Sequence, residues 1–167
     1  MADWTITSED RWEIQDLYAR YAWGIDLADV DMALSAFSRD AFFDHLWQGR
    51  VQGHDAIRKN LESLWYDRQS WWYGRQHTMN THLMTPRDDG KIDCKCFFQI
   101  LQFNVQYNTN FVFGIGTRQD VIVKEEGKWL FEELHVNAWT DMNEVPWQGE
   151  LTMKTKTGKP ARKEAAQ

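Results

Sequence analysis

Residues 75–106 read RQHTMNTHLMTPRDDGKIDCKCFFQILQFNVQ, and this stretch decides the fold. Apolar and polar side chains alternate along it, which is the pattern of a half-buried β-strand. The Asp-Asp-Gly tripeptide at 88–90 interrupts the alternation and is a hairpin turn signal. The pattern therefore predicts antiparallel strands at 75–84 and 91–106, joined by a tight turn.

The alternation continues toward the C-terminus, whereas the residues upstream have helical spacing. Two more strands are predicted at 111–123 and 129–137. The predicted upstream elements are a helix that begins near Thr7 and buries Ile14, Leu17, Tyr18, Tyr21 and Ile25, helices at 29–37 and 55–65, and short strands at 41–45 and 49–53. Helices followed by an antiparallel meander indicate an α+β fold. We expect a strongly curved sheet that wraps over the helices and leaves a cone open at one end.

Composition limits the class of protein. The chain has 167 residues, of which 43% are hydrophobic, enough for one domain with a real core. A net charge of −6 argues against non-specific nucleic-acid binding, which needs a basic surface. Ten Trp residues exceed what packing requires, so we expect aromatic side chains to line a cavity, an oligomer interface, or both. The aromatic segment 65–73 is expected to wall the pocket, cover its mouth or contact a second subunit.

The charge distribution separates a body from a tail. Residues 146–167 carry five basic and two acidic side chains, so their net charge is +3 and that of residues 1–145 is −9. We expect a domain at 1–145 followed by a solvated basic tail at 146–167. The alternative is that segment 147–153 folds over the cavity mouth or onto a neighbouring subunit.

Targeting and cofactor signals are sparse in the sequence. No run of apolar residues is long enough for a membrane span, and the polar N-terminus predicts no signal peptide. Cys94 and Cys96 lie too close along a strand to bridge each other, so we expect reduced thiols and a cytoplasmic protein. A metal site is not expected, because no second cysteine pair completes one. No nucleotide- or cofactor-binding motif is present, so catalysis, if any, must come from ordinary side chains.

His77 is the first candidate for proton transfer, because imidazole suits this task near neutral pH. Strand alternation places five residues on one face: Arg75, His77, Met79, Thr81 and Leu83. If Met79 and Leu83 mark the inner face, His77 points into the cone and His82 points outward or into an interface. The competing interpretation is a structural histidine, which is the commoner role for a lone histidine in a strand.

Asp26 is the candidate partner, because it follows the buried stripe of the first helix among apolar neighbours. It is either a cap for the next helix or a buried carboxylate, and a buried carboxylate needs a hydrogen-bond partner. His77 would meet that need. The carboxylate would fix the imidazole tautomer and stabilise the imidazolium that forms when the other nitrogen takes a proton. Tyr21, on the same helix, is suited to donate a hydrogen bond to a leaving group or an oxyanion.

Several short segments together resemble a known family. The segments are IQDLYARY at 14–21 with Asp26 following, DAFFD at 40–44, GHDAI at 53–57, RQHTMNTHL at 75–83 and GKWLF at 127–131. Their order and spacing, over roughly 8–140, resemble SnoaL-like proteins of the nuclear-transport-factor-like superfamily. The resemblance implies a cone-shaped α+β barrel, in agreement with the pattern-based prediction.

The resemblance also implies a chemistry. Scytalone dehydratase, bile-acid 7α-dehydratase and hexachlorocyclohexane dehydrochlorinase are cofactor-free lyases of this superfamily with a His-Asp dyad, onto which His77 and Asp26 fall. Tyr21 falls where the bile-acid dehydratase type has a catalytic tyrosine. Other relatives are isomerases, polyketide cyclases, lyases that release formaldehyde from lignin-derived diaryl compounds, and non-catalytic transport factors or dioxygenase small subunits. Fold alone does not choose among them.

We therefore expect a cofactor-independent lyase that takes part in aromatic-compound catabolism. It would eliminate water, halide or formaldehyde from a bulky apolar, aromatic small molecule, with His77, Asp26 and Tyr21 as catalytic residues. The expected substrate-binding residues are Tyr18, Trp23, Phe43, Arg118, His135 and Trp139. Arg118 is expected either to contact an anion or leaving group or to lie at the surface or an interface. The alternatives are an isomerase or cyclase with the same dyad, and a non-catalytic binding module. We expect a homo-oligomer, dimer or trimer, and no nucleic-acid or membrane partner.

Overall fold

The computed structural model describes residues 2–45, 49–66 and 74–139. The proposed tail at 146–167 and most of the aromatic segment 65–73 lie outside these ranges, so the division at residue 145 stays a prediction. Within the described ranges, no helix is both long enough and apolar enough to cross a membrane.

The first helix, α1 (Ser8–Leu27), begins where the sequence predicts. Thr7 and Asp10 form a reciprocal cap, since the Thr7 side chain accepts from the Asp10 amide and the Asp10 carboxylate accepts from the Thr7 amide. The expected stripe of Ile14, Leu17, Tyr18, Tyr21 and Ile25 is buried. Through this stripe, α1 packs against the hydrophobic core of the domain.

The helix ends at Ala28, whose φ of 62° is left-handed and turns the chain sharply. The next helix, α2 (Val30–Leu34), packs so closely on α1 that a Cβ at Gly24 would lie 2.4 Å from the Ala33 nitrogen. Helix α2 is shorter than the predicted 29–37, because Phe37 already belongs to a strand. Helix α3 (His54–Tyr66) matches the prediction closely.

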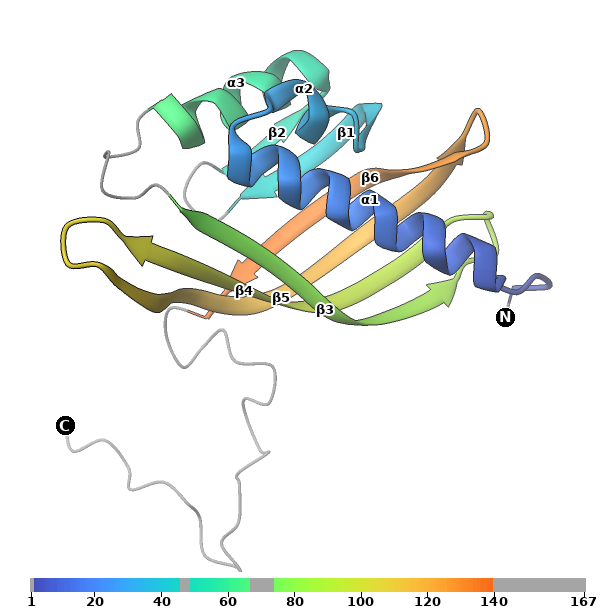
Figure 1. The fold of residues 1–167 in the computed structure, drawn as a ribbon. Coiled ribbons are helices and arrows are strands. Elements are labelled where there is room, and N and C mark those ends of the chain that lie inside the picture. The colour runs from blue at the N-terminus through green and yellow to red at the C-terminus, as the bar shows by residue number, and fades with distance from the viewer. Residues whose placement is uncertain (1, 46–48, 67–73, 140–167) are drawn as a thin grey trace, which may run out of the picture.

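Six strands form one sheet in the order β2-β1-β6-β5-β4-β3. They are β1 (Phe37–His45), β2 (Gly49–Gln52), β3 (Arg75–Pro86), β4 (Ile92–Asn104), β5 (Thr109–Glu125) and β6 (Lys128–Ala138). Neighbours are antiparallel except β1 and β6, which are parallel. Figure 1 shows α1 lying along one face of this curved sheet, and α1 contacts β3 and β6. The predicted α+β fold is therefore confirmed, with a sheet that curls without closing.

A bulge in β3 changes the facing of its second half. Asn80 pairs with Phe97 and Leu83 pairs with Lys95, so β3 has one extra residue there, and Thr81 adopts a φ of 57°. His82 consequently turns inward, where its ring centroid lies 4.5 Å from that of Tyr18. Leu83 is 65% exposed. The predictions of an outward His82 and an inward Leu83 are wrong, while His77 and Met79, which precede the bulge, keep their expected facing.

Candidate active site

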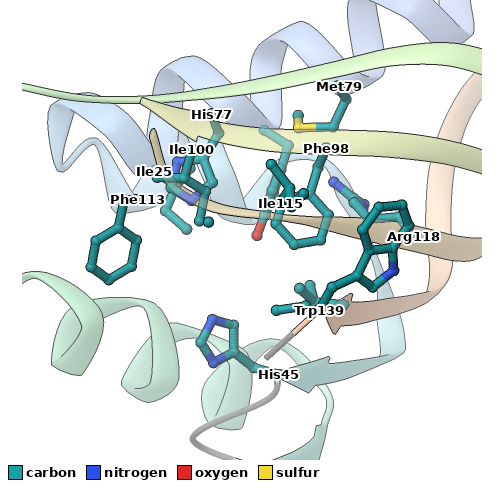
Figure 2. Close-up of a pocket in the computed structure, with 14 residues that line it drawn as sticks. Ile25, His45, His77, Met79, Phe98, Ile100, Phe113, Ile115, Arg118 and Trp139 are labelled. Atoms are coloured by element: carbon teal, nitrogen blue, oxygen red, sulfur yellow. The ribbon is translucent and has the colours of Figure 1, made fainter. Parts of the chain in front are cut away.

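A cavity of about 250 Å³ lies between α1 and the curved sheet (Figure 2). Its wall is mostly apolar, with a few polar side chains at separate points. The apolar lining consists of Ile25, Met79, Phe98, Ile100, Phe113, Ile115, Val136 and Ala138, with Gly114 and Trp139 beside them. The polar lining consists of Tyr21, His45, His77 and Arg118. An apolar pocket with a few convergent polar groups is typical of a small-molecule site.

His77 and Asp26 meet at the edge of this cavity, as the sequence predicts. The Asp26 carboxylate accepts a hydrogen bond from the His77 backbone N–H at 2.7 Å and contacts the ring nitrogen Nδ1 at 2.5 Å. Both side chains are mostly buried, with 15% and 13% of their surfaces exposed. A carboxylate only accepts, so the contact places the imidazole proton on Nδ1. Among the described residues, no hydrogen bond engages Nε2, which is therefore the nitrogen available to a ligand.

Tyr21 lies one helical turn before Ile25 and lines the same cavity from α1. Burial raises the pKa of Tyr21 to about 12, so the side chain stays a neutral phenol at physiological pH. Its ring meets those of Phe37, Phe43 and Phe131 edge-on, which fixes its position. A protonated, rigidly held phenol is suited to donate a hydrogen bond into the cavity.

Arg118 is only 2% exposed, so the alternative of a surface arginine is wrong. Its Nη2 lies 2.8 Å from Asp120 Oδ2, and the same carboxylate oxygen accepts from the Tyr18 hydroxyl at 2.6 Å. Burial raises the pKa of Asp120, while Arg118 and Tyr18 oppose that shift by stabilising the anion. The guanidinium carbon stands 4.9 Å from the ring centres of Tyr18 and Tyr21. Within the described residues, Arg118 Nε and Nη1 are buried and have no hydrogen-bond partner.

His45 also lines the cavity, although it is not among the site residues expected from the sequence. It ends β1, where Ala41, Phe43 and His45 are buried in alternation. Burial lowers the pKa of His45 to about 4, with a smaller contribution from the charge of His77, so the ring is neutral at pH 7. The alternation at 41–45 was the signal that would have placed His45 on the inner face.

The remaining expected substrate-binding residues are distributed unevenly. Trp139 lines the cavity, but Tyr18 and Phe43 lie in the core behind it. Trp23 is 60% exposed and borders a second hollow, which Asp26 and His77 also line. His135 faces away from the cavity, because an extra residue in β6 near Glu132 reverses the alternation that starts at Trp129.

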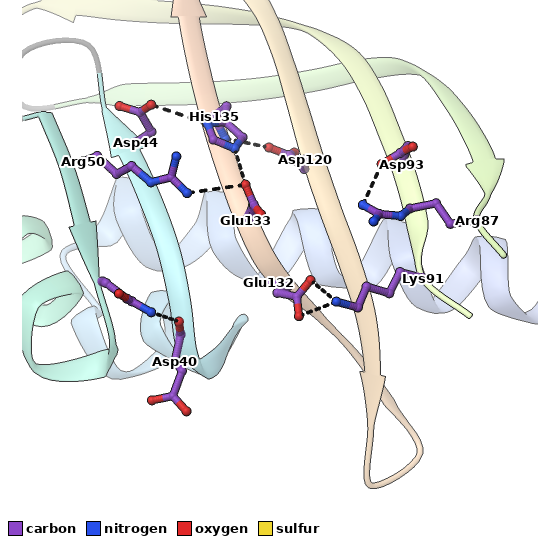
Figure 3. A network of polar contacts seen from close by, with 11 residues as sticks. Asp40, Asp44, Arg50, Arg87, Lys91, Asp93, Asp120, Glu132, Glu133 and His135 are labelled. Carbon is purple, nitrogen blue, oxygen red and sulfur yellow. Dashed lines mark hydrogen bonds and ion pairs between the residues drawn. The ribbon is translucent and has the colours of Figure 1, made fainter. Parts of the chain in front are cut away.

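His135 belongs instead to a polar cluster on the other face of the sheet (Figure 3). Its Nε2 lies 2.9 Å from Glu133 and its Nδ1 lies 3.4 Å from Asp44, while Arg50 approaches Glu133 at 3.7 Å. Its backbone N–H donates to Asp120 Oδ1 at 3.1 Å. These contacts link β1, β2, β5 and β6.

Cys94 and Cys96 are both free and buried near the Arg118 pair. Burial raises the pKa of the Cys94 thiol to about 11 and that of the Cys96 thiol to about 12. Both therefore stay protonated at neutral pH and act as small apolar side chains.

Comparisons with known proteins agree with the fold. A family model described as a SnoaL-like domain matches residues 7–135. Among solved structures, ActVI-ORFA from Streptomyces coelicolor is similar with a TM-score of 0.72 at 17% identity, covering 80% of this chain and 100% of that one. A protein of unknown function with a cystatin-like fold from Nostoc punctiforme has a TM-score of 0.70 at 20% identity, covering 85% and 100%.

A candidate scytalone dehydratase from Novosphingobium aromaticivorans is also similar, with a TM-score of 0.64 at 17% identity, covering 78% of this chain and 84% of that one. Identities this low show only a shared fold, so the chemistry has to be argued from the residues of the site. Among curated proteins, none matches the sequence.

Proposed function

This chain belongs to the SnoaL-like family, and on that premise we propose that it is a cofactor-independent lyase acting on an aromatic small molecule. The observation that carries the proposal is the double contact of Asp26 with His77 at the wall of an apolar cavity. A carboxylate that holds an imidazole by Nδ1 leaves Nε2 as a base and stabilises the imidazolium formed after proton abstraction. General-base catalysis of this kind contributes about 10²–10⁴-fold in rate.

In the proposed elimination, His77 Nε2 takes a proton from a carbon of the substrate. The electrons of that C–H bond form a C=C bond, and the leaving group departs from the adjacent carbon with its bonding pair. A hydroxide leaving group is protonated to water, whereas a halide leaves as the anion. In this proposal Tyr21 and Arg118, which both line the cavity, donate hydrogen bonds to the leaving group or to the developing anion.

Release of formaldehyde is the second form of the same chemistry. His77 would take the proton of a hydroxymethyl group, the C=O bond of formaldehyde would form, and the carbon–carbon bond would break. The electron pair of that bond would form a C=C bond to the next carbon, and the leaving group on that carbon would depart with its bonding pair. In both forms the product is an alkene conjugated with the rest of the molecule.

The cavity supports an aromatic substrate. Apolar cavities of about 150 Å³ bind benzene, so a cavity of about 250 Å³ suits one substituted ring or a fused pair. Phe98, Phe113 and Trp139 present aromatic surfaces to such a ring. Of the expected substrate-binding residues, we retain Arg118 and Trp139 as contacts and assign Tyr18 and Phe43 to the packing behind them.

Product analysis tests the reaction class. Purified protein is incubated with a panel of aromatic alcohols, diols and chlorides, and the masses of the products are measured by mass spectrometry. A lyase gives a product lighter than the substrate by water, by hydrogen halide, or by formaldehyde together with the leaving group, and the His77→Gln variant forms it at least about 10²-fold more slowly. A product of unchanged mass would instead support an isomerase or cyclase with the same dyad. Absence of turnover together with a copurifying larger subunit would support the non-catalytic alternative.

We also propose that the protein forms a homo-oligomer in the cytoplasm. Leu83, Phe97 and Val112 on β3, β4 and β5 are 65%, 40% and 57% exposed, and we propose that a second copy of the chain covers this apolar surface. Two free cysteines suit a reducing compartment. Light scattering coupled to size exclusion tests the assembly, and a mass of 19.8 kDa would show a monomer.

A further inference from the structure

Two histidines face each other across the cavity, and only one of them belongs to the dyad. His77 comes from β3 and His45 from β1, and Figure 2 shows their rings on opposite sides of the space between them. Strands β6, β5 and β4 separate β1 from β3 in the sheet. The curvature of the sheet therefore brings together two imidazoles that lie far apart along it.

The surroundings of the two rings differ in charge. The Asp26 carboxylate contacts His77, so a proton gained by His77 is balanced by a neighbouring negative charge. His45 is 9% exposed and packs edge-on against Phe43, with ring centroids 5.7 Å apart. Its neighbour Asp44, which His135 engages on the other face of the sheet, only partly offsets the lowering of the His45 pKa by burial. A charge on His45 would also be repelled by a protonated His77.

These differences give the two histidines separate roles. His77 is suited to accept and hold a proton, whereas His45 stays a neutral imidazole with one N–H donor and one acceptor nitrogen. In a cavity whose lining is mostly apolar, a fixed polar group of this kind orients a ligand through a hydrogen bond.

We infer, on the basis of the proposed function, that His45 is a second ligand-contacting residue that hydrogen-bonds an oxygen of the aromatic ligand opposite His77. The substrate is then an aromatic molecule with a hydroxyl or carbonyl oxygen on the side away from the carbon that loses its proton. His45 holds that oxygen and sets which carbon faces His77 Nε2.

A pair of matched probes tests this role without a known substrate. Dissociation constants of naphthalene and 2-naphthol, which differ by one hydroxyl, are measured by fluorescence titration for the wild type and His45→Phe. We expect the wild type to prefer 2-naphthol, and His45→Phe to weaken 2-naphthol about threefold to tenfold while naphthalene binds as before. His135→Phe, on the opposite face of the sheet, is the matched control and should change neither constant.

A conservative variant and a measurement on the wild type distinguish the loss of a ligand contact from misfolding of His45→Phe. His45→Gln keeps a donor and an acceptor, and it should recover most of the affinity for 2-naphthol. In the ¹⁵N-histidine-labelled wild type, 2-naphthol should shift the imidazole nitrogens of His45, assigned by their loss in His45→Gln.

The inference is overturned if the wild type does not prefer 2-naphthol, if His45→Phe weakens both probes equally or neither, or if the His45 nitrogens do not respond. Its failure differs from failure of the proposed function. If the protein has no lyase activity but His45→Phe still weakens only 2-naphthol, the role of His45 in ligand binding stands. If the protein is an active lyase but His45→Phe causes no selective loss of affinity for 2-naphthol, the role of the dyad stands and the role of His45 is refuted.

Discussion

Asp26 holds His77 at two points, with one carboxylate oxygen on the backbone N–H of His77 and the other on ring nitrogen Nδ1. The backbone contact fixes where β3 stands relative to the end of α1, and the ring contact fixes the rotation of the imidazole. A side chain held at both points is pre-organised, which is what a positioned general base requires. The site therefore depends on how accurately the last turn of α1 is placed.

Gly24→Ala should destabilise the protein, although alanine is the better helix former. An added Cβ would meet the Ala33 nitrogen at 2.4 Å, so α2 has to move away from α1 two residues before Asp26. We expect urea unfolding to show a loss of about 2 kcal/mol or more, against the gain of about 1 kcal/mol typical of this substitution in an exposed helix. Unchanged or increased stability would show that the two helices are not in close contact.

Thr81→Asn should stabilise the fold. Thr81 is a β-branched residue with a φ of 57°, a conformation that asparagine tolerates better. We expect a gain of about 0.5–1 kcal/mol in the free energy of unfolding. Thr78→Asn, in the same strand with an exposed side chain, is the matched control and should be neutral or destabilising. Equal losses in the two variants would contradict the bulge at Thr81.

Arg118→Met should be strongly destabilising, because it leaves the Asp120 carboxylate buried without its cation. Breaking a buried pair by removing one partner costs about 3–5 kcal/mol. The double variant Arg118→Met, Asp120→Asn removes both charges and should recover part of that loss. Chemical unfolding measures both values. A loss below about 1 kcal/mol for the single variant would mean that Asp120 is solvated.

Acidification should destabilise the wild type more than His45→Gln. The pKa of His45 is about 4 in the folded protein and 6.5 when unperturbed, so between these values the unfolded chain binds a proton that the folded chain does not. Stability therefore rises with pH across this window and falls as the pH drops. Comparing the change in unfolding free energy from pH 7 to pH 5 isolates His45, and we expect the wild type to lose about 2 kcal/mol more. Parallel pH profiles would contradict a buried neutral His45.

Sequence patterns predict the elements and the inward facing of His77, because both depend on local periodicity. The pairing of His77 with Asp26 is predicted differently, from the need of a buried carboxylate for a partner and from the family resemblance. His77 precedes the bulge at Thr81, so its predicted facing is correct, whereas His82 and Leu83 follow the bulge and their facing is reversed. The predicted facing of His135 is wrong for the same reason, because β6 contains an extra residue before it. A bulge adds one residue without a composition signal, so alternation holds only up to it.

Long-range pairing sets the remaining features of the site. The contact of Arg118 with Asp120 and Tyr18, and the approach of His45 to the dyad, depend on how far the sheet curls. Residue spacing along single strands does not contain that curvature. Trp23 shows a further limit of sequence patterns. It is expected to bind substrate because it lies near Asp26 on the same helix, but its side chain points outward.

The central claim is that His77, oriented by Asp26, removes a proton from a bound aromatic molecule. Turnover of the substrate found by product analysis tests it most directly, measured for the wild type, His77→Gln and Asp26→Asn together with their melting temperatures. We predict that each variant loses about 10²-fold or more in kcat while it melts close to the wild type. A folded variant that keeps more than about a tenth of wild-type turnover would contradict the claim, because losing a general base costs at least tenfold.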